Sequence, residues 1–328
     1  MLGAVALVGA ASLHPSISLN RPVFRYLFIL DITQSMNARD YELDGRPVDR
    51  LSYARQAVRT ALLALPCGSE AGLGVFTTKN TEILFEPIET CSHLPVALDV
   101  LEHVDWRMAW AGDSYIADGL FSALRALSAR PAPVRLVFLS DGQQTPANAV
   151  PPKYSGTRGE IPGLLIGVGG NRPVPIPRLD LENRQGGFWQ SADVAAPVSS
   201  TAYENDLQGE IAEESSREGP YMTRVFEDRL QRLADQTGLD YRRLTDPEAF
   251  ARLLLDERNA ERRSVPTDIA PALTALAWLL AVGSYAGRID SLRRRWRLAL
   301  QALGQRVGNG LSPPRDRRAR LSRHRREA

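Results

Sequence analysis

The chain has few of the residues on which several large enzyme classes depend. Its 328 residues include four histidines, two cysteines and only two lysines, Lys79 and Lys153. The histidines are not spaced as zinc ligands are, and the sequence has neither a G-x-S-x-G nucleophile elbow nor a phosphate-binding P-loop motif. These absences argue against zinc enzymes, α/β-hydrolases and P-loop nucleotidases. No internal repeat is present either.

The net charge is also close to zero, but positive and negative residues are unevenly distributed along the chain. The formal net charge is only +2, and the segment from Arg288 to the end holds thirteen arginines against three acidic residues. The rest of the chain is therefore mildly acidic. A nucleic-acid-binding surface needs clustered positive charge, so we expect none on the main part of the chain.

Between residues 24 and 257, short apolar runs alternate with segments of helical periodicity. This alternation predicts an α/β fold, a doubly wound and mostly parallel sheet of the Rossmann-like kind. Residues 37–49, 146–159 and 173–221 are predicted loops, and the last is long enough to be functional or mobile. The predicted strands are 24–31, 72–77, 82–86, 134–141, 163–169 and 240–244, and the predicted helices are 51–65, 94–104, 114–127, 225–237 and 246–257.

Two uncharged segments predict that transmembrane helices flank this domain. Residues 1–20 favour a membrane anchor or uncleaved signal, with a disordered apolar tail as the alternative. Residues 269–287 would span about 28 Å as a helix, close to the thickness of a bilayer core, with a buried core helix as the alternative. By the positive-inside rule, the Arg-rich tail 288–328 is cytoplasmic and the domain 22–259 lies outside. In a bacterium, this topology means the inner membrane and a periplasmic domain.

The two cysteines, Cys67 and Cys91, flank a predicted hairpin. In the cytoplasm they would be incidental thiols. Outside it, their 24-residue separation suits a structural disulfide. With the topology above, we expect a Cys67–Cys91 disulfide.

Oxygen-bearing side chains follow two predicted strands and precede one helix. Asp31, Thr33 and Ser35 form a D-x-T-x-S pattern at the end of the first strand, Ser114 precedes a helix, and Asp141 ends a later strand. Hard oxygens of this kind suit Mg²⁺ or Ca²⁺. Each also has an ordinary structural explanation, because such residues cap helices and form turns.

Taken in this order, D-I-T-Q-S-M, Ser114 and L-S-D-G resemble the von Willebrand factor A domain and its metal-ion-dependent adhesion site, over roughly residues 22–255. The resemblance implies that Asp31, Ser35, Ser114 and Asp141 hold one divalent cation, with Thr33 in its outer shell. It also implies that the cation binds an acidic residue of a partner protein. Two departures are Ser114, where the family usually has Thr, and Asp113, where Gly is common.

The anchored layout resembles two bacterial groups of such proteins. MxaL-type proteins of methanol-oxidation gene clusters imply an accessory role in calcium insertion into, or maturation of, periplasmic methanol dehydrogenase, with that enzyme or sister A-domain proteins as partners. Bat-type aerotolerance proteins imply instead a stress-related scaffold. The D-I-T-Q-S-M-N-A-R-D-Y run and the paired cysteines favour the first group.

An enzyme remains the competing hypothesis. Phosphotransferases of the haloacid dehalogenase type end a strand in D-x-D, where the second Asp transfers protons. Here Thr33 takes that position and cannot exchange protons near neutral pH. We therefore expect a metal-dependent binding protein that is not an enzyme, with a metal-free scaffold and a metal-dependent phosphohydrolase as alternatives.

Overall fold

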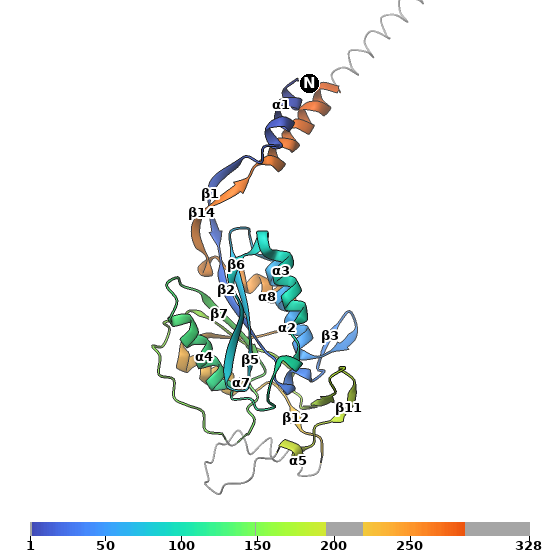
Figure 1. Ribbon diagram of the computed structural model, residues 1–328, viewed down its shortest axis with the longest axis vertical. Helices are drawn as coiled ribbons and strands as arrows, with labels where there is room; N and C mark the ends of the chain where they lie inside the picture. Colours follow the sequence, from blue (N-terminus) through green and yellow to red (C-terminus); the bar gives the residue numbers. More distant parts are fainter. Residues whose placement is uncertain (1, 148, 195–218, 286–328) are drawn as a thin grey trace, which may run out of the picture. The chain divides into compact units, whose positions relative to one another are not determined.

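The computed structural model describes residues 2–147, 149–194 and 219–285. The chain divides into two units, one made of residues 1–18 and 266–328 and the other of residues 19–265. The larger unit is built around a six-stranded sheet (Figure 1). In spatial order its strands are β13 (Asp240–Arg243), β8 (Gly163–Gly167), β7 (Arg135–Ser140), β2 (Arg25–Asp31), β5 (Glu70–Thr77) and β6 (Asn80–Glu89).

All neighbouring strands of this sheet are parallel except β6, which pairs antiparallel with β5. The predicted α/β fold with a mostly parallel sheet is thereby confirmed. The predicted last strand also lies where expected, because β13 is at the edge.

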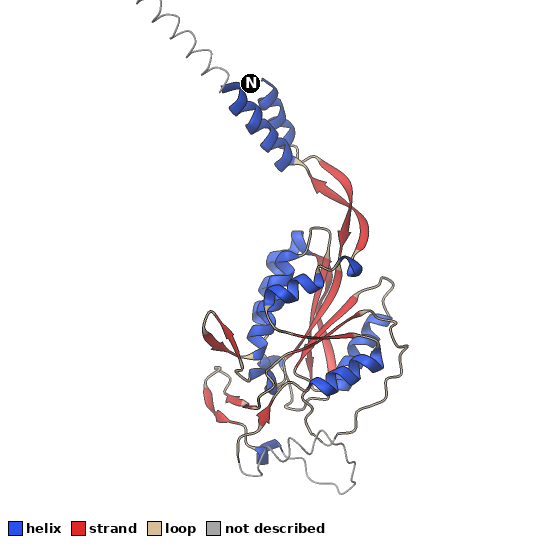
Figure 2. Ribbon diagram, turned by 180° about the vertical axis from the view of Figure 1, so that it is seen from behind, coloured by secondary structure: helices blue, strands red, loops and turns tan. Residues whose placement is uncertain are grey.

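Helices cover both faces of the sheet (Figure 2). One face packs against α2 (Arg50–Ala64), α3 (Thr90–His103) and α8 (Pro247–Leu254), and the other against α4 (Ile116–Ser128) and α7 (Glu227–Thr237). Strand β2 serves both layers, since Tyr26, Phe28 and Leu30 join one core cluster while Leu27 and Ile29 join the other. Burial on both faces explains why this strand is a continuous apolar run.

The strand order produces a topological switch point at the carboxyl ends of β2 and β7. From β2 the chain passes through α2 to β5 on one side, and it later passes through α4 to β7 on the other side of β2. The direction of winding therefore reverses between β2 and β7. Ligands of open α/β sheets bind at such switch points, outside the carboxyl ends of the strands.

The predicted disulfide is confirmed. Cys67 and Cys91 are bonded, with their Cα atoms 5.2 Å apart. Cys67 precedes β5 and Cys91 follows β6. The bond therefore lies at the amino ends of the parallel strands, opposite the carboxyl ends where β2 and β7 meet.

Three regions differ from their predictions. Residues 37–49 are not only a loop, because β3 (Tyr41–Leu43) and β4 (Arg46–Val48) form a hairpin. Residues 16–23 and 261–268 form a further strand pair, β1 (Ser16–Val23) with β14 (Glu261–Asp268). The described part of 173–221 is more regular than predicted. It holds β9 (Val174–Pro175), which pairs with β12 (Met222–Thr223), then β10 (Pro177–Leu179), β11 (Gln185–Phe188) and α5 (Ser191–Val194).

The smaller unit contains α1 (Leu2–Ala11) and a helix over residues 270–285, which lie side by side in Figures 1 and 2. Ala11 and Ala277 are buried. Within the described ranges, no helix is long and apolar enough to cross a membrane. The segment 1–20 is not one continuous helix, since β1 begins at Ser16. The predicted span 269–287 extends two residues beyond the described range, and the predicted tail 288–328 lies wholly outside it.

Candidate cation site

The five residues predicted to surround a cation converge at the switch point. Asp31 ends β2, Thr33 and Ser35 lie in the turn and the short helix η1 (Gln34–Asn37) that follow, and Asp141 comes directly after β7. Ser114 lies in the segment before α4, at the same carboxyl end of the sheet. All five residues are between 0 and 4% exposed.

The carboxylate of Asp31 is held by hydroxyl and amide donors. Its Oδ1 accepts hydrogen bonds from the backbone N–H of Thr33 at 2.9 Å and from the Thr33 hydroxyl at 2.7 Å. Its Oδ2 accepts one from the hydroxyl of Ser140 at 2.6 Å. A carboxylate oxygen has two lone pairs, so Oδ2 keeps one free for a further ligand.

Asp141 is paired with an arginine that belongs to α2. The Asp141 Oδ2 accepts from Arg50 Nη1 at 2.7 Å and from the Thr223 hydroxyl at 3.2 Å, while its Oδ1 accepts from the backbone of Gln143. Arg50 has no exposed surface. Its Nε and Nη2 donate to Asp40, so one buried guanidinium bridges two carboxylates.

The hydroxyl of Ser114 is positioned by the loop after β7. Backbone hydrogen bonds of 2.8 Å run in both directions between Ser114 and Thr145, and the Ser114 hydroxyl donates to the carbonyl of Gln143 at 2.9 Å. Its lone pairs remain available. The Ser35 hydroxyl lies 3.4 Å from that of Thr33. Both serines can therefore offer oxygen to a cation.

Three of these hydroxyls open onto a pocket of about 350 Å³, whereas the two carboxylates lie beneath them. Thr33, Ser35 and Ser114 line the pocket, and Asp31 and Asp141 do not. The outer wall comes from the region of residues 173–221. It is formed by Ile176, Trp189, Asp193, Val194 and Tyr221.

Electrostatics favour a cation at this point. Burial, and then the nearby charge of Asp141, raise the pKa of Asp31, which means that its negative charge is poorly compensated. When all three carboxylates are ionised, Asp31, Asp40 and Asp141 with Arg50 carry two net negative charges. A divalent cation would neutralise them. The free lone pairs of Asp31 and Asp141 and the hydroxyls of Ser35 and Ser114 are hard donors, so the residues fit Mg²⁺ or Ca²⁺.

The residues present also limit what the site can hold. Within the described ranges, no group of three or more His, Cys, Asp and Glu side chains could hold a metal ion. A cation here would therefore depend on the serine hydroxyls as well as on the two carboxylates. Asp113, the departure noted in the sequence, lines the pocket as an exposed residue.

Sequence reasoning missed Arg50, Asp40, Thr223 and Ser140. For Arg50 a signal existed, because it stands at the first position of α2 after the N-cap Asp49, where a cation is unfavourable to the helix dipole. Such a placement asks for a compensating partner. Thr223 lies far along the chain, and nothing in its local sequence indicates a contact with Asp141.

Part of the larger unit is similar to a known protein family. Residues 26–144 match the family profile of the von Willebrand factor type A domain. None of the curated proteins compared with the chain matches it.

Solved structures show more distant likeness. An aerotolerance-related membrane protein from Bacteroides fragilis is 16% identical, with a TM-score of 0.44 over 71% of this chain and 98% of that one. BatB from Bacteroides thetaiotaomicron is 18% identical, with a TM-score of 0.46 over the same shares. A von Willebrand factor type A protein from Catenulispora acidiphila is 12% identical, with a TM-score of 0.41 over 74% of this chain and 45% of that one. The similarity to the von Willebrand factor type A domain rests on the profile match over residues 26–144.

Proposed function

We propose that this chain carries a von Willebrand factor type A domain and that the domain is a cation-dependent protein-binding module. One observation carries the proposal: the poorly compensated carboxylate of Asp31 and the carboxylate of Asp141, which is paired with Arg50, lie beneath three hydroxyl-bearing residues that line an open pocket. Asp31, Ser35, Ser114 and Asp141 would hold Mg²⁺ or Ca²⁺, and Thr33 would orient Asp31. The ion would supply an open coordination position for an acidic side chain of the partner.

The wall of the pocket supports a protein ligand rather than a small inorganic ion alone. Trp189 and Tyr221 are of the residue types enriched in protein-binding hot spots. Trp189 Nε1 and Gln143 Oε1 are buried and have no hydrogen-bond partner among the described residues. A peptide group or side-chain amide beside the acidic residue would satisfy this donor and this acceptor.

Asp113 and Asp193 also line the pocket and add negative charge near its mouth. Without a cation, these carboxylates would repel an acidic partner. With a cation below them, attraction would prevail close to the ion. The proposed binding is therefore conditional on the metal.

We further propose that the domain lies in the periplasm, attached to the bacterial inner membrane, with its C-terminal tail in the cytoplasm. The Cys67–Cys91 disulfide supports an oxidising compartment. Of the three structures named above, one is called aerotolerance-related, another is called BatB, and none bears a methanol-oxidation name. We therefore favour a binding module that acts in a Bat-type scaffold. We do not propose a role in calcium insertion into methanol dehydrogenase.

We propose no enzymatic activity for this site. The Thr33 hydroxyl donates to Asp31 and stands where a phosphohydrolase would need an acid. Turnover of a generic phosphate ester that requires Mg²⁺ and is lost in Asp31→Ala would favour the enzyme instead.

Calorimetric titration of the full chain with Mg²⁺ and with Ca²⁺ tests the cation site. Asp31→Ala should abolish binding of the preferred ion, because it removes a carboxylate next to it, while Asp99→Ala, an exposed residue of α3, should leave binding unchanged. Equal affinity in the two variants would refute the assignment.

A second titration tests the proposed mode of binding. A short peptide containing one glutamate should bind the wild-type chain only when the cation is present, and the same peptide with glutamine should not bind. Binding of the ion without any effect on the glutamate peptide would give the ion a structural role and overturn the adhesion mechanism.

A further inference from the structure

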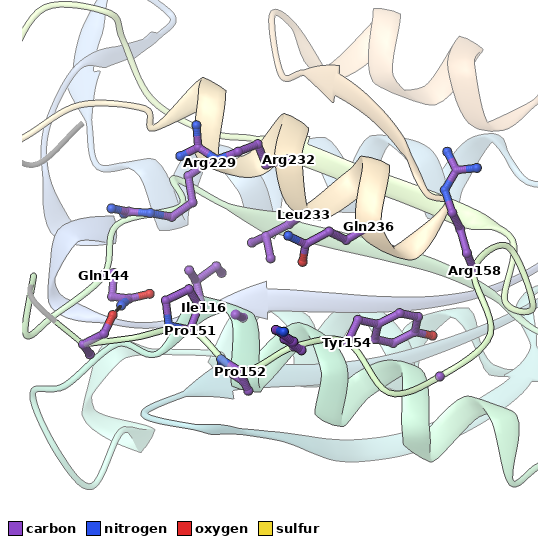
Figure 3. Close-up of a pocket in the computed structure, with 14 residues that line it drawn as sticks. Ile116, Gln144, Pro151, Pro152, Tyr154, Arg158, Arg229, Arg232, Leu233 and Gln236 are labelled. Atoms are coloured by element: carbon purple, nitrogen blue, oxygen red, sulfur yellow. Dashed lines mark hydrogen bonds between the residues drawn. The ribbon is translucent and has the colours of Figure 1, made fainter. Parts of the chain in front are cut away.

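A second and larger pocket lies between α4, α7 and the segment 149–158 (Figure 3). Its volume is about 760 Å³, within the range of pockets that bind organic ligands. The proposed cation site does not use it.

Positive charge dominates this pocket. Its described lining includes Lys153, Arg158, Arg229 and Arg232 and no acidic residue. None of the salt bridges within the described ranges involves these four cations. Figure 3 shows Arg229 and Arg232 together at one end and Arg158 at the other.

Arg229 is held in place although it forms no salt bridge with the described residues. Its Nη1 donates to the carbonyl of Gly142 at 2.8 Å, and its guanidinium lies 5.0 Å from the ring of Phe226. Burial, and then repulsion by Arg232, lower the pKa of Arg229 to about 10. The guanidinium remains charged at neutral pH, and a nearby anion would stabilise it.

The middle of the pocket has apolar side chains on both walls, together with the amide of Gln236. Ile116 of α4 and Leu233 of α7 face the segment that holds Pro151, Pro152 and Tyr154 (Figure 3). The pocket therefore offers cations at its two ends and a largely apolar surface between them, on which Gln236 adds one amide.

This arrangement is fixed before any ligand arrives. The ring of Tyr154 packs on Phe121 of α4 at 5.0 Å, and Arg158 Nε donates to the carbonyl of Asp235 at 2.6 Å. The backbone of Gly159 donates to Thr237 at 2.8 Å. Two successive prolines restrict the backbone further. Little entropy would be lost in ordering the segment on binding.

We propose that this pocket binds an elongated organic anion that carries acidic groups at both ends of an apolar body. One acidic group would pair with Arg229 and Arg232, the apolar body would lie against Leu233 and Tyr154, and the second group would reach Arg158. The inference does not depend on the proposed cation site.

Titration of the full chain with naphthalene disulfonate, which has its two sulfonates at opposite ends of the rings, tests the proposal. Dihydroxynaphthalene with the same substitution pattern is the uncharged control. Arg232→Gln should weaken binding of the disulfonate by about threefold to tenfold, because a charged hydrogen-bond donor is lost. Arg125→Gln, an equal change of charge at an exposed position of α4 outside the pocket, should have no effect.

Saturable binding of the disulfonate that is lost selectively in Arg232→Gln supports the site. Two outcomes would overturn it. In one, the uncharged compound binds as tightly as the disulfonate, so the cations do not recognise the ligand. In the other, Arg232→Gln and Arg125→Gln behave alike, so the disulfonate responds only to net charge.

Discussion

The two pockets of the domain are neighbours, but among the described residues the charged side chains of one are paired with each other and those of the other are not. The loop after β7 serves both, since Gln143 lines the pocket above the candidate cation site and Gln144 lines the pocket between α4 and α7. In the first, buried carboxylates share an internal cation, Arg50. In the second, Arg232 and Lys153 have no acidic partner within the described ranges.

The difference follows from burial. A carboxylate removed from water is costly unless it is paired, so Asp40 and Asp141 need Arg50 whether or not an ion binds. Arg232 is exposed and water can solvate it, so it remains unpaired at little cost. The pairing with Arg50 stabilises the carboxylates of the candidate cation site even when no metal ion is bound. The cationic side chains of the pocket between α4 and α7 are instead free to bind an anion.

The largest effect on stability should come from removing the buried guanidinium of Arg50. Arg50→Met keeps much of the volume but leaves Asp40 and Asp141 unpaired, and should lower the free energy of unfolding by about 3–5 kcal/mol. Arg59→Met, at an exposed position of the same helix, should change it by less than about 0.5 kcal/mol. Urea denaturation measures both, and coincident midpoints would mean that the pairing contributes little.

A smaller effect should follow from removing the disulfide, which lies far from the candidate cation site. Replacing Cys67 and Cys91 together by serine should cost about 2–4 kcal/mol in unfolding free energy, because the unfolded chain regains the freedom of the closed loop. Cation and disulfonate binding should be unchanged in the folded variant. Loss of either would show that the opposite edge of the sheet helps to shape the binding sites.

The smallest effect separates the two pockets from each other. Ser114→Ala should weaken cation binding by about tenfold, comparable to losses on changing residues around other metal sites, whereas Ser114→Thr keeps the oxygen and should be nearly silent. Neither should alter disulfonate binding, because Ser114 does not line the second pocket. Calorimetry of each variant with each ligand gives the comparison, and equal cation affinity for Ala and Thr would remove Ser114 from the site.

The sequence predicted the sheet well where burial is two-sided, and less well where it is not. The apolar runs that became β2, β7 and β8 are buried on both faces and were predicted as strands, and the resemblance to the von Willebrand factor A domain brought Asp31 and Asp141 at the ends of two of them together. β1 and β14 were missed, since S-I-S-L-N-R-P-V and E-R-R-S-V-P-T-D are polar, partly exposed and contain proline.

The hairpin of β3 and β4 did leave a signal. Asp44 and Gly45 have φ angles of 52° and 72°, as a tight two-residue turn requires, and Asp-Gly is a typical sequence for it. The second pocket left none, because Arg229 on α7 and Lys153 in a loop meet only through tertiary packing. Position in the fold, rather than residue pattern, decides such sites.

Because β1 pairs with β14, the two ends of the domain lie close together, which suits the domain for insertion into another protein. Both strands contact the turn at Gly68, where an added Cβ would lie 2.6 Å from Val265 and 3.2 Å from Val23, so the two ends of the segment 19–265 leave the domain at one place. A domain whose ends are adjacent can be inserted into a surface loop of a host protein without separating the two halves of that loop. Grafted in this way, the segment could serve as a genetically encoded cation sensor, with fluorescent proteins reporting from the host.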